Sequence, residues 1–416
     1  MRTILVYAAL GLTLAAPPAF AAKLVVDSDG KATPANCDAA TPTPYLTIQS
    51  AIDAAASGDT VVVCPGTGPY DEQPVVDKAL RISGRGDATV KPSPMLDNTT
   101  SLTTGNAIAA GILVKDTVGV TIESLAVDGA DNGGTDCTKD PVGIYFRNAS
   151  GTIRDVATRN HVLGAGLEGC QGGLGILVQS GGDGSSAVVV QDNSVHDYQK
   201  NGITASGTGT SLVARRNKVT GLGPTPHIAQ NGIQLSFGAG GTIENNVVAN
   251  HVWSRCTADD CAFVSTNILV FQAADGAVTR GNTVVNSQVS IDYFQTNGGT
   301  IQGNDVTQSS PFDAISVDGG SSNNMIQGNV LSHSDEAGIF LDGNGNTVRR
   351  NTVNEAPIGI WNFGGTNTIA TTGFQMNHFF NVGVAIHTGT TPPLAPTLRR
   401  PAAARTTRAA APSPVP

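Results

Sequence analysis

Short runs in which apolar and polar residues alternate recur along the chain from about Asp192 to Thr388. A period of two is typical of β-strands, because successive side chains of a strand point to opposite faces. Each copy opens with an asparagine, at Asn193, Asn217, Asn246, Asn282, Asn304, Asn329, Asn351 and Asn377. Copies this short cannot each bury a core, so the pattern predicts a solenoid of stacked coils.

One isoleucine in each copy is expected to point into the solenoid, at Ile203, Ile233, Ile268, Ile291, Ile315, Ile339 and Ile360. Alternation then turns the residues one and three places later outward. The stacked asparagines are predicted to bond to one another and to the turn backbone, as part of the scaffold rather than as ligands.

A single short helix is predicted ahead of the coils. One helical face is formed by Ile48, Ala51, Ile52 and Ala55; Thr47 can cap the start and Gly58 the end. A helix laid over the first coil would bury the open end of a solenoid core and block edge-to-edge association.

The segment TIQSAIDAAASGDTVVVCPGTGPYDEQ, followed by coils with an asparagine ladder and Gly-Ile strands, resembles the pectin-lyase-like superfamily with its PbH1-type repeats. The resemblance covers about residues 45 to 390. It implies an all-β, right-handed parallel β-helix with a short N-terminal capping helix. Polysaccharide lyases, glycoside hydrolases, uronate epimerases and non-catalytic surface proteins share this fold, so the resemblance indicates architecture more than activity.

The two ends of the chain differ from the coils. Residues 1–22 have Arg2, an apolar run and PPAFAA, which predicts a signal peptide and a protein secreted to the periplasm, cell envelope or medium. Residues 23–390 are the predicted β-helix with its cap. Residues 391–416 are rich in Pro, Ala and Arg without acids, which predicts a disordered tail.

The charge and the absence of long apolar runs limit the partners. The formal net charge is -9 and no lysine follows Lys218, so nucleic-acid binding is not expected. No stretch of the mature chain approaches the roughly 20 apolar residues of a transmembrane segment.

Six cysteines in an exported chain indicate disulfides. Cys137 and Cys170 lie seven and six residues before Ile144 and Ile176, so stacking of these isoleucines predicts a Cys137–Cys170 bond. The other expected pairs are Cys37–Cys64 and Cys256–Cys261. A metal site is the alternative, but no CxxC or HxxxH spacing accompanies the cysteines.

The outward positions from Leu269 onward concentrate aromatic and acidic residues, although aromatics make up only 5% of the chain. Exposed apolar patches mark contact sites, and a row of rings suits sugars. The predicted substrate-binding residues are Phe271, Phe294, Phe340, Trp361, Phe363 and His387. No Arg or Lys follows Arg147 on this predicted face, which favours a neutral or weakly acidic polysaccharide.

Asp292, Asp318 and Asp342 are the predicted catalytic residues. Asp318 and Asp342 take the same place on adjacent coils, about 4.8 Å apart, and Asp292 lies roughly 8 Å from Asp318. Glycosidases place their two carboxyl groups at about 5–5.5 Å or about 6.5–9.5 Å. The alternative for Asp318 and Asp342 is an ordinary turn, because each precedes a glycine.

Three functions stay open at this point. The first is a polysaccharide-active glycoside hydrolase or lyase that uses these carboxylates, with no cofactor expected. The second is a non-catalytic protein of the envelope or matrix that binds glycan or protein. The third is a Ca²⁺-dependent uronate lyase or epimerase. The catalytic motifs of polygalacturonases and pectate lyases are absent: the Asp-Asp pair Asp259–Asp260 lies in a loop, and the Gly-His-Gly and Arg-Ile-Lys segments are missing.

Overall fold

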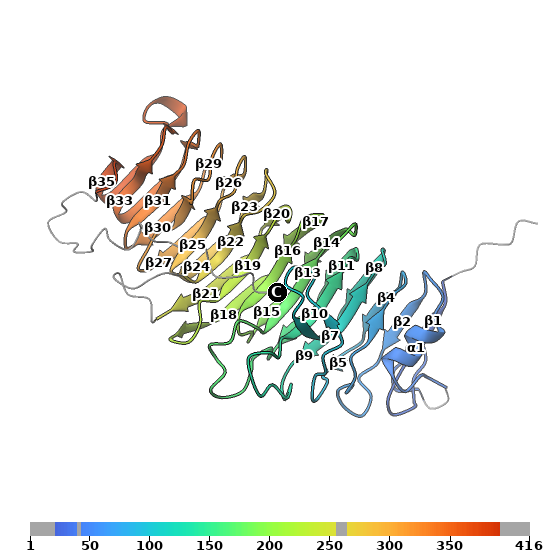
Figure 1. Ribbon diagram of the computed structural model, residues 1–416. Coiled ribbons are helices and arrows are strands. Elements are labelled where there is room, and N and C mark those ends of the chain that lie inside the picture. The colour runs from blue at the N-terminus through green and yellow to red at the C-terminus, as the bar shows by residue number, and fades with distance from the viewer. Residues whose placement is uncertain (1–20, 40–42, 255–263, 392–416) are drawn as a thin grey trace, which may run out of the picture.

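The computed structural model describes residues 21–39, 43–254 and 264–391. Its strands stack as successive coils along one axis, from β1 at the N-terminal end to β35 at the other (Figure 1). Each full coil adds one strand to each of three faces, and strands of neighbouring coils pair in parallel. The predicted all-β parallel β-helix is confirmed.

The first face is one 13-stranded sheet within the described residues: β1 (Lys23–Val26), β2 (Thr60–Val63), β4 (Arg81–Gly84), β8 (Val120–Glu123), β11 (Gly151–Arg154), β14 (Ser186–Gln191), β17 (Thr210–Arg215), β20 (Gly240–Glu244), β23 (Val278–Arg280), β26 (Thr300–Gln302), β29 (Met325–Gln327), β32 (Thr347–Arg349) and β34 (Thr368–Ile369).

The second face contains β5 (Thr89–Val90), β9 (Ala126–Asp128), β12 (Ala157–Arg159), β15 (Ser194–His196), β18 (Lys218–Thr225), β21 (Val247–Trp253), β24 (Thr283–Ser287), β27 (Asp305–Ser309) and β30 (Val330–Ser334). The third face contains β3 (Val75–Val76), β7 (Ala107–Lys115), β10 (Pro141–Arg147), β13 (Leu174–Gln179), β16 (Asn201–Ser206), β19 (Asn231–Ser236), β22 (Thr266–Phe271), β25 (Val289–Phe294), β28 (Ile315–Asp318) and β31 (Ala337–Asp342).

Two long strands, β33 (Thr352–Gly364) and β35 (His378–Thr388), run through both the second and the third face. A short strand, β6 (Thr99–Thr100), pairs antiparallel with β7, and a 3-10 turn spans Gly373–Gln375.

The core is a column of aliphatic side chains along the axis. All seven predicted inward isoleucines are fully buried in one cluster. They also lie in register from coil to coil, as in Ile203 opposite Ile233 and Ile291 opposite Ile315. Burial of a side chain of this size stabilises the fold by about 1.5–3 kcal/mol, so the repeat is held chiefly by this column.

The asparagine ladder is confirmed from Asn193 to Asn377. In each step the side-chain oxygen accepts from the backbone N and the Nδ2 of the preceding asparagine; both distances are 2.9 Å from Asn217 to Asn246. The residue before each ladder asparagine from Asn193 to Asn351 turns the corner with positive φ, as at Asp192 (60°) and Gly281 (64°). The asparagines therefore satisfy buried backbone groups at a corner that strand pairing cannot serve.

The N-terminal end is covered by α1 (Ile48–Ala54), as predicted. Ile48 and Ile52 lie in the main core cluster, and the Thr47 hydroxyl accepts from Ser50 N. The predicted end at Gly58 is wrong, because the helix stops at Ala54 with Ala55 as its C-cap. The Glu72 carboxylate, which the sequence did not single out, accepts from the first two backbone N–H groups of the helix.

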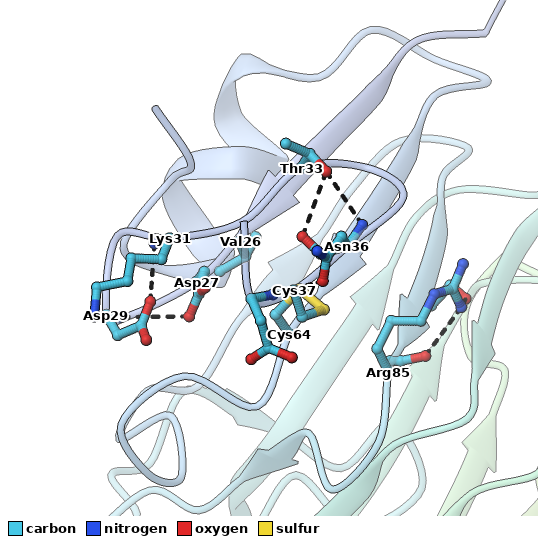
Figure 2. Close-up of a disulfide and its surroundings, with 12 residues drawn as sticks. Val26, Asp27, Asp29, Lys31, Thr33, Asn36, Cys37, Cys64 and Arg85 are labelled. Carbon is cyan, nitrogen blue, oxygen red and sulfur yellow. Dashed lines mark hydrogen bonds between the residues drawn. A yellow bond between two sulfur atoms is a disulfide. The ribbon is translucent and has the colours of Figure 1, made fainter. Parts of the chain in front are cut away.

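Two predicted disulfides are confirmed. Cys37–Cys64 joins the N-terminal segment to the residue after β2, with a Cα–Cα distance of 5.6 Å, and lies close to Asn36 (Figure 2). Cys137–Cys170 joins two long connections on neighbouring coils, with a Cα–Cα distance of 5.1 Å. The predicted Cys256–Cys261 pair, the signal peptide up to residue 20 and the tail from residue 392 lie outside the described residues.

A buried carboxyl group lies beside the second disulfide. Asp140 is 4% exposed, and its Oδ1 accepts from Gly173 N at 2.9 Å. Burial raises the pKa of Asp140 to about 7, and Asp97 adds to the rise while the Gly173 N–H opposes it. The folded protein therefore holds a proton here that the unfolded chain releases near the ordinary pKa of 3.8.

Asp140→Asn is expected to stabilise the protein above pH 7. The parent's contribution from Asp140 is complete below about pH 4 and is lost as the pH rises through about 7, by up to about 4 kcal/mol. The difference in urea midpoint between Asp140→Asn and parent, measured from pH 4 to 8, should grow with pH. The exposed Asp87→Asn is the control, and a flat difference curve for Asp140→Asn would contradict the assignment.

Candidate functional site

The outward side chains of the third face differ in chemical type from the early coils to the late coils. On the early coils the outward side chains Leu113, Tyr145 and Leu177 form their own buried cluster. The segment that contains β6 packs against them: Leu102 N and Tyr145 Oη both donate to Gln179 Oε1, at 2.9 and 2.6 Å. The chain itself thus covers this part of the surface.

The next two coils present uncharged polar groups. Thr204 and Gln234 lie side by side on β16 and β19, as do Ser206 and Ser236. The Gln234 side chain accepts from Asn201 Nδ2 at 3.1 Å and donates to Ser236 Oγ at 3.0 Å. These amide contacts fix the polar surface in one arrangement.

Aromatic rings begin at the following coil, in a first ring cluster. Phe271 stacks on Phe294 with ring centroids 5.2 Å apart and an interplanar angle of 9°. Phe237 meets Phe271 edge-on at 5.3 Å. Phe237 was missed by the sequence prediction, because it follows β19 in the corner with φ 52° rather than at an outward strand position.

A second ring cluster lies on the last coils. Phe340 meets Trp361 at 5.6 Å and Phe363 at 5.4 Å, and Trp361 lies 5.9 Å from both Phe363 and His387. His387 is opposite Trp361 in the ladder, with Ile386 pointing inward. His387 therefore lies beside Trp361 rather than beside Phe363 in the ladder.

The prediction of an exposed aromatic stripe is wrong. Phe340 and Trp361 are 3% and 1% exposed, and Phe271 and Phe294 are 7% and 9% exposed. Contacts between the rings bury part of each side chain, and Phe340 and Trp361 form a hydrophobic cluster with Ala337 and Ile358. Phe363 and His387 are half-buried.

The three predicted aspartates lie between the two ring clusters. Phe294 is opposite Asp318, and Val317 is opposite Leu341. Asp318 and Asp342, the next residues along, therefore occupy neighbouring places at the ends of β28 and β31. Asp292 lies one coil earlier and two places back, opposite Ser316.

The turn interpretation also applies to Asp318. Its carbonyl accepts from Ser321 N and Ser321 Oγ, and Gly319 and Gly320 have φ values of 61° and 84°. The backbone of Asp318 thus belongs to a turn, while its side chain takes an outward position of β28 and is buried by its neighbours, so the two interpretations are compatible.

The sequence prediction missed a further acid. Asp313 lies two places before Ile315, the first residue of β28, and is fully buried. Both Ala314 and Ile315 point into the core, so a simple alternation of two fails there. We call the set Asp292, Asp318 and Asp342 the acidic face. No group of three His, Cys, Asp or Glu side chains in the described ranges has a metal-binding arrangement.

Positive charges lie elsewhere on these coils. From residue 264 to 391 the cations are Arg280, Arg349 and Arg350. Arg280 bonds to Glu244 and Arg349 to Gln327 on the first face, and Arg350 donates to Phe374 O. The described part of the outer third face after β22 is therefore acidic and aromatic.

Comparison with known proteins agrees with the geometry. Residues 215–379 match the family model described as "Right handed beta helix region". The protein is a right-handed parallel β-helix. No curated protein gives a significant sequence match to it.

Two solved structures resemble this β-helix over most of its length. The GH136 lacto-N-biosidase from Eubacterium ramulus is 13% identical with a TM-score of 0.59, and the match covers 88% of this chain and 68% of that one. The Dettilon tailspike protein is 16% identical with a TM-score of 0.51, covering 87% and 68%. At these identities the likeness concerns the fold. Among the described residues of the β-helix, no helix has the length and apolar character needed to cross a bilayer.

Proposed function

We propose that this β-helix is an exported protein that binds a polysaccharide along the outer third face after β22 and cleaves or modifies it. Asp292, Asp318 and Asp342 supply the acid and base groups, and the residues of the two ring clusters line the binding surface. The observation that carries the proposal is the register that sets Asp318 beside Asp342 between the two ring clusters.

The spacing of these aspartates suits glycosidic bond chemistry. Neighbouring parallel strands are about 4.8 Å apart, so an Asp318–Asp342 pair falls near the separation of about 5–5.5 Å used with retention of configuration. Asp292 and Asp318 are roughly 8 Å apart by the same geometry, within the range used with inversion. In either pair one carboxyl protonates the leaving oxygen while the other attacks carbon or activates water.

Burial distinguishes the roles of the predicted binding residues. Asp342, Phe363 and His387 are half-buried, whereas Trp361 is enclosed by its neighbours. We assign direct sugar contact to Phe363 and His387, and assign to Phe340 and Trp361 the support of that surface. Phe271 and Phe294 form the corresponding support on the other side of the aspartates.

The comparisons support a carbohydrate-related role in general terms. One similar fold is a lacto-N-biosidase and another a tailspike protein. Two disulfides among the described cysteines are compatible with an oxidising compartment outside the cytoplasm, which supports export.

The test is a screen of the mature protein against neutral and acidic polysaccharides, with and without Ca²⁺. Reducing ends released without absorbance at 235 nm would indicate a hydrolase, and unsaturated product would indicate a lyase. Binding on a glycan array with no product from any substrate would refute the catalytic proposal and leave a binding protein. Turnover abolished by chelation would instead indicate the Ca²⁺-dependent class.

A further inference from the structure

The chain leaves the described region on the same outer surface that carries the acidic face. After β35, Gly389 O accepts from Trp361 Nε1 at 2.8 Å, and Thr391 O is 2.6 Å from His387 Nε2. Trp361 and His387 belong to the second ring cluster. The residues that follow Thr391 therefore start beside these rings.

The charge of the following segment complements this surface. Residues 392–416 contain Arg399, Arg400, Arg405 and Arg408 and no acidic residue. The acidic face holds three carboxyl groups on three successive coils, and the arginines between residues 264 and 391 lie on or beside the first face. Opposite charges across a partly buried surface attract with little screening.

A hydroxyl group on the same surface points to a ligand. Ser316 lies between Asp292 and Phe340 in the ladder, is fully buried, and its Oγ has no hydrogen-bond partner among the described residues. A buried hydroxyl without a partner costs about 1–3 kcal/mol. A chain passing over the acidic face with its backbone groups could satisfy it.

The reach of the segment matches the distance. From Trp361 to Asp292 is three strand spacings, about 14 Å. Eight residues, from 392 to 399, can span at most about 26 Å. This reach is enough to bring Arg399 and Arg400 to every carboxylate of the acidic face.

We propose that the arginine-containing segment, residues 392–416, binds back along the acidic face of its own chain. Arg399 and Arg400 pair with the carboxylates there, and the guanidinium planes pack against the neighbouring rings. A polysaccharide that uses this face must then displace the segment. The segment occupies this surface whether or not the protein is catalytic.

The test measures how fast trypsin cleaves the full-length chain after Arg405 and Arg408, followed by intact-mass spectrometry. Asp292→Asn/Asp318→Asn/Asp342→Asn is expected to speed this cleavage about tenfold, the effect of releasing about 1.4 kcal/mol of binding free energy. Arg399→Gln/Arg400→Gln removes the positive partners of the same contact and should speed the cleavage to a similar extent. This variant leaves the β-helix unchanged.

The matched control neutralises three exposed aspartates away from the face, Asp183→Asn/Asp275→Asn/Asp305→Asn. It has the same net charge as the first variant and should be cleaved at the parent rate. Equal rates in the parent and the Arg399→Gln/Arg400→Gln variant would overturn the proposal. So would an equal gain from the control triple variant, since the effect would then come from net charge alone.

Discussion

Asp318→Asn and Asp342→Asn are each expected to lower turnover of the polysaccharide by at least about 100-fold, the usual contribution of a general acid or base. Asparagine keeps the size and most of the hydrogen bonds of aspartate but neither donates nor accepts a proton in the reaction. Unfolding midpoints should stay close to the parent value. The measurement is initial rate on the substrate found in the screen, with substrate binding measured in parallel.

Asp292→Asn separates the two possible pairings. If Asp318 and Asp342 act together, Asp292→Asn should retain much of the activity and the product should keep its anomeric configuration. If Asp292 pairs with Asp318, its loss should be as severe and the configuration should invert. Asp305→Asn, on the second face, serves as the control. Full activity in both Asp318→Asn and Asp342→Asn would rule out the catalytic role of this pair.

Asn282→Leu is expected to destabilise the protein by about 3–6 kcal/mol. The Asn282 side chain accepts from Asn246 N and Nδ2 and donates to Ile243 O and Asn304 Oδ1. Leucine fills the space but leaves several buried polar groups without partners, at about 1–3 kcal/mol each. The measurement is thermal and urea unfolding by circular dichroism.

The matched control for Asn282→Leu is Asn106→Leu, because Asn106 is exposed and lies outside the ladder. This variant should unfold within about 0.5 kcal/mol of the parent. Similar midpoints for the two variants would mean that the ladder asparagines contribute little beyond filling the corner. A loss confined to Asn282→Leu would show that the ladder stabilises the coils.

The fold could be predicted because each coil repeats its chemistry. In successive coils an isoleucine fills the core and an asparagine satisfies the backbone groups at a corner. Because the pattern recurs several times, the alignment of one coil on the next can be deduced from the sequence. A second ladder, Asn324 to Asn346 to Asn367, was missed because only three coils carry it. Short repeats within a longer one are hard to distinguish from chance.

The candidate site was predicted less well, because its properties depend on contacts between side chains. Alternation placed Phe340 and Trp361 on the outer side, but their mutual packing and resulting burial need the rotamers of both rings. Asp313 was missed because two successive core residues, Ala314 and Ile315, break the alternation at the corner. Where the backbone leaves regular strand geometry, a period of two no longer predicts which side chains point into the core and which point outward.

The asparagine ladder also keeps the distance between neighbouring coils constant, whatever the number of residues in each coil. Asn246 and Asn282 are separated by 36 residues and Asn282 and Asn304 by 22, yet the Nδ2 to Oδ1 distances are 3.0 and 2.9 Å. Extra residues are accommodated at another corner without stretching the stack. Segments could therefore be lengthened, shortened or exchanged beside the binding surface while the row of outward positions keeps its pitch, which makes this scaffold suitable for loop grafting.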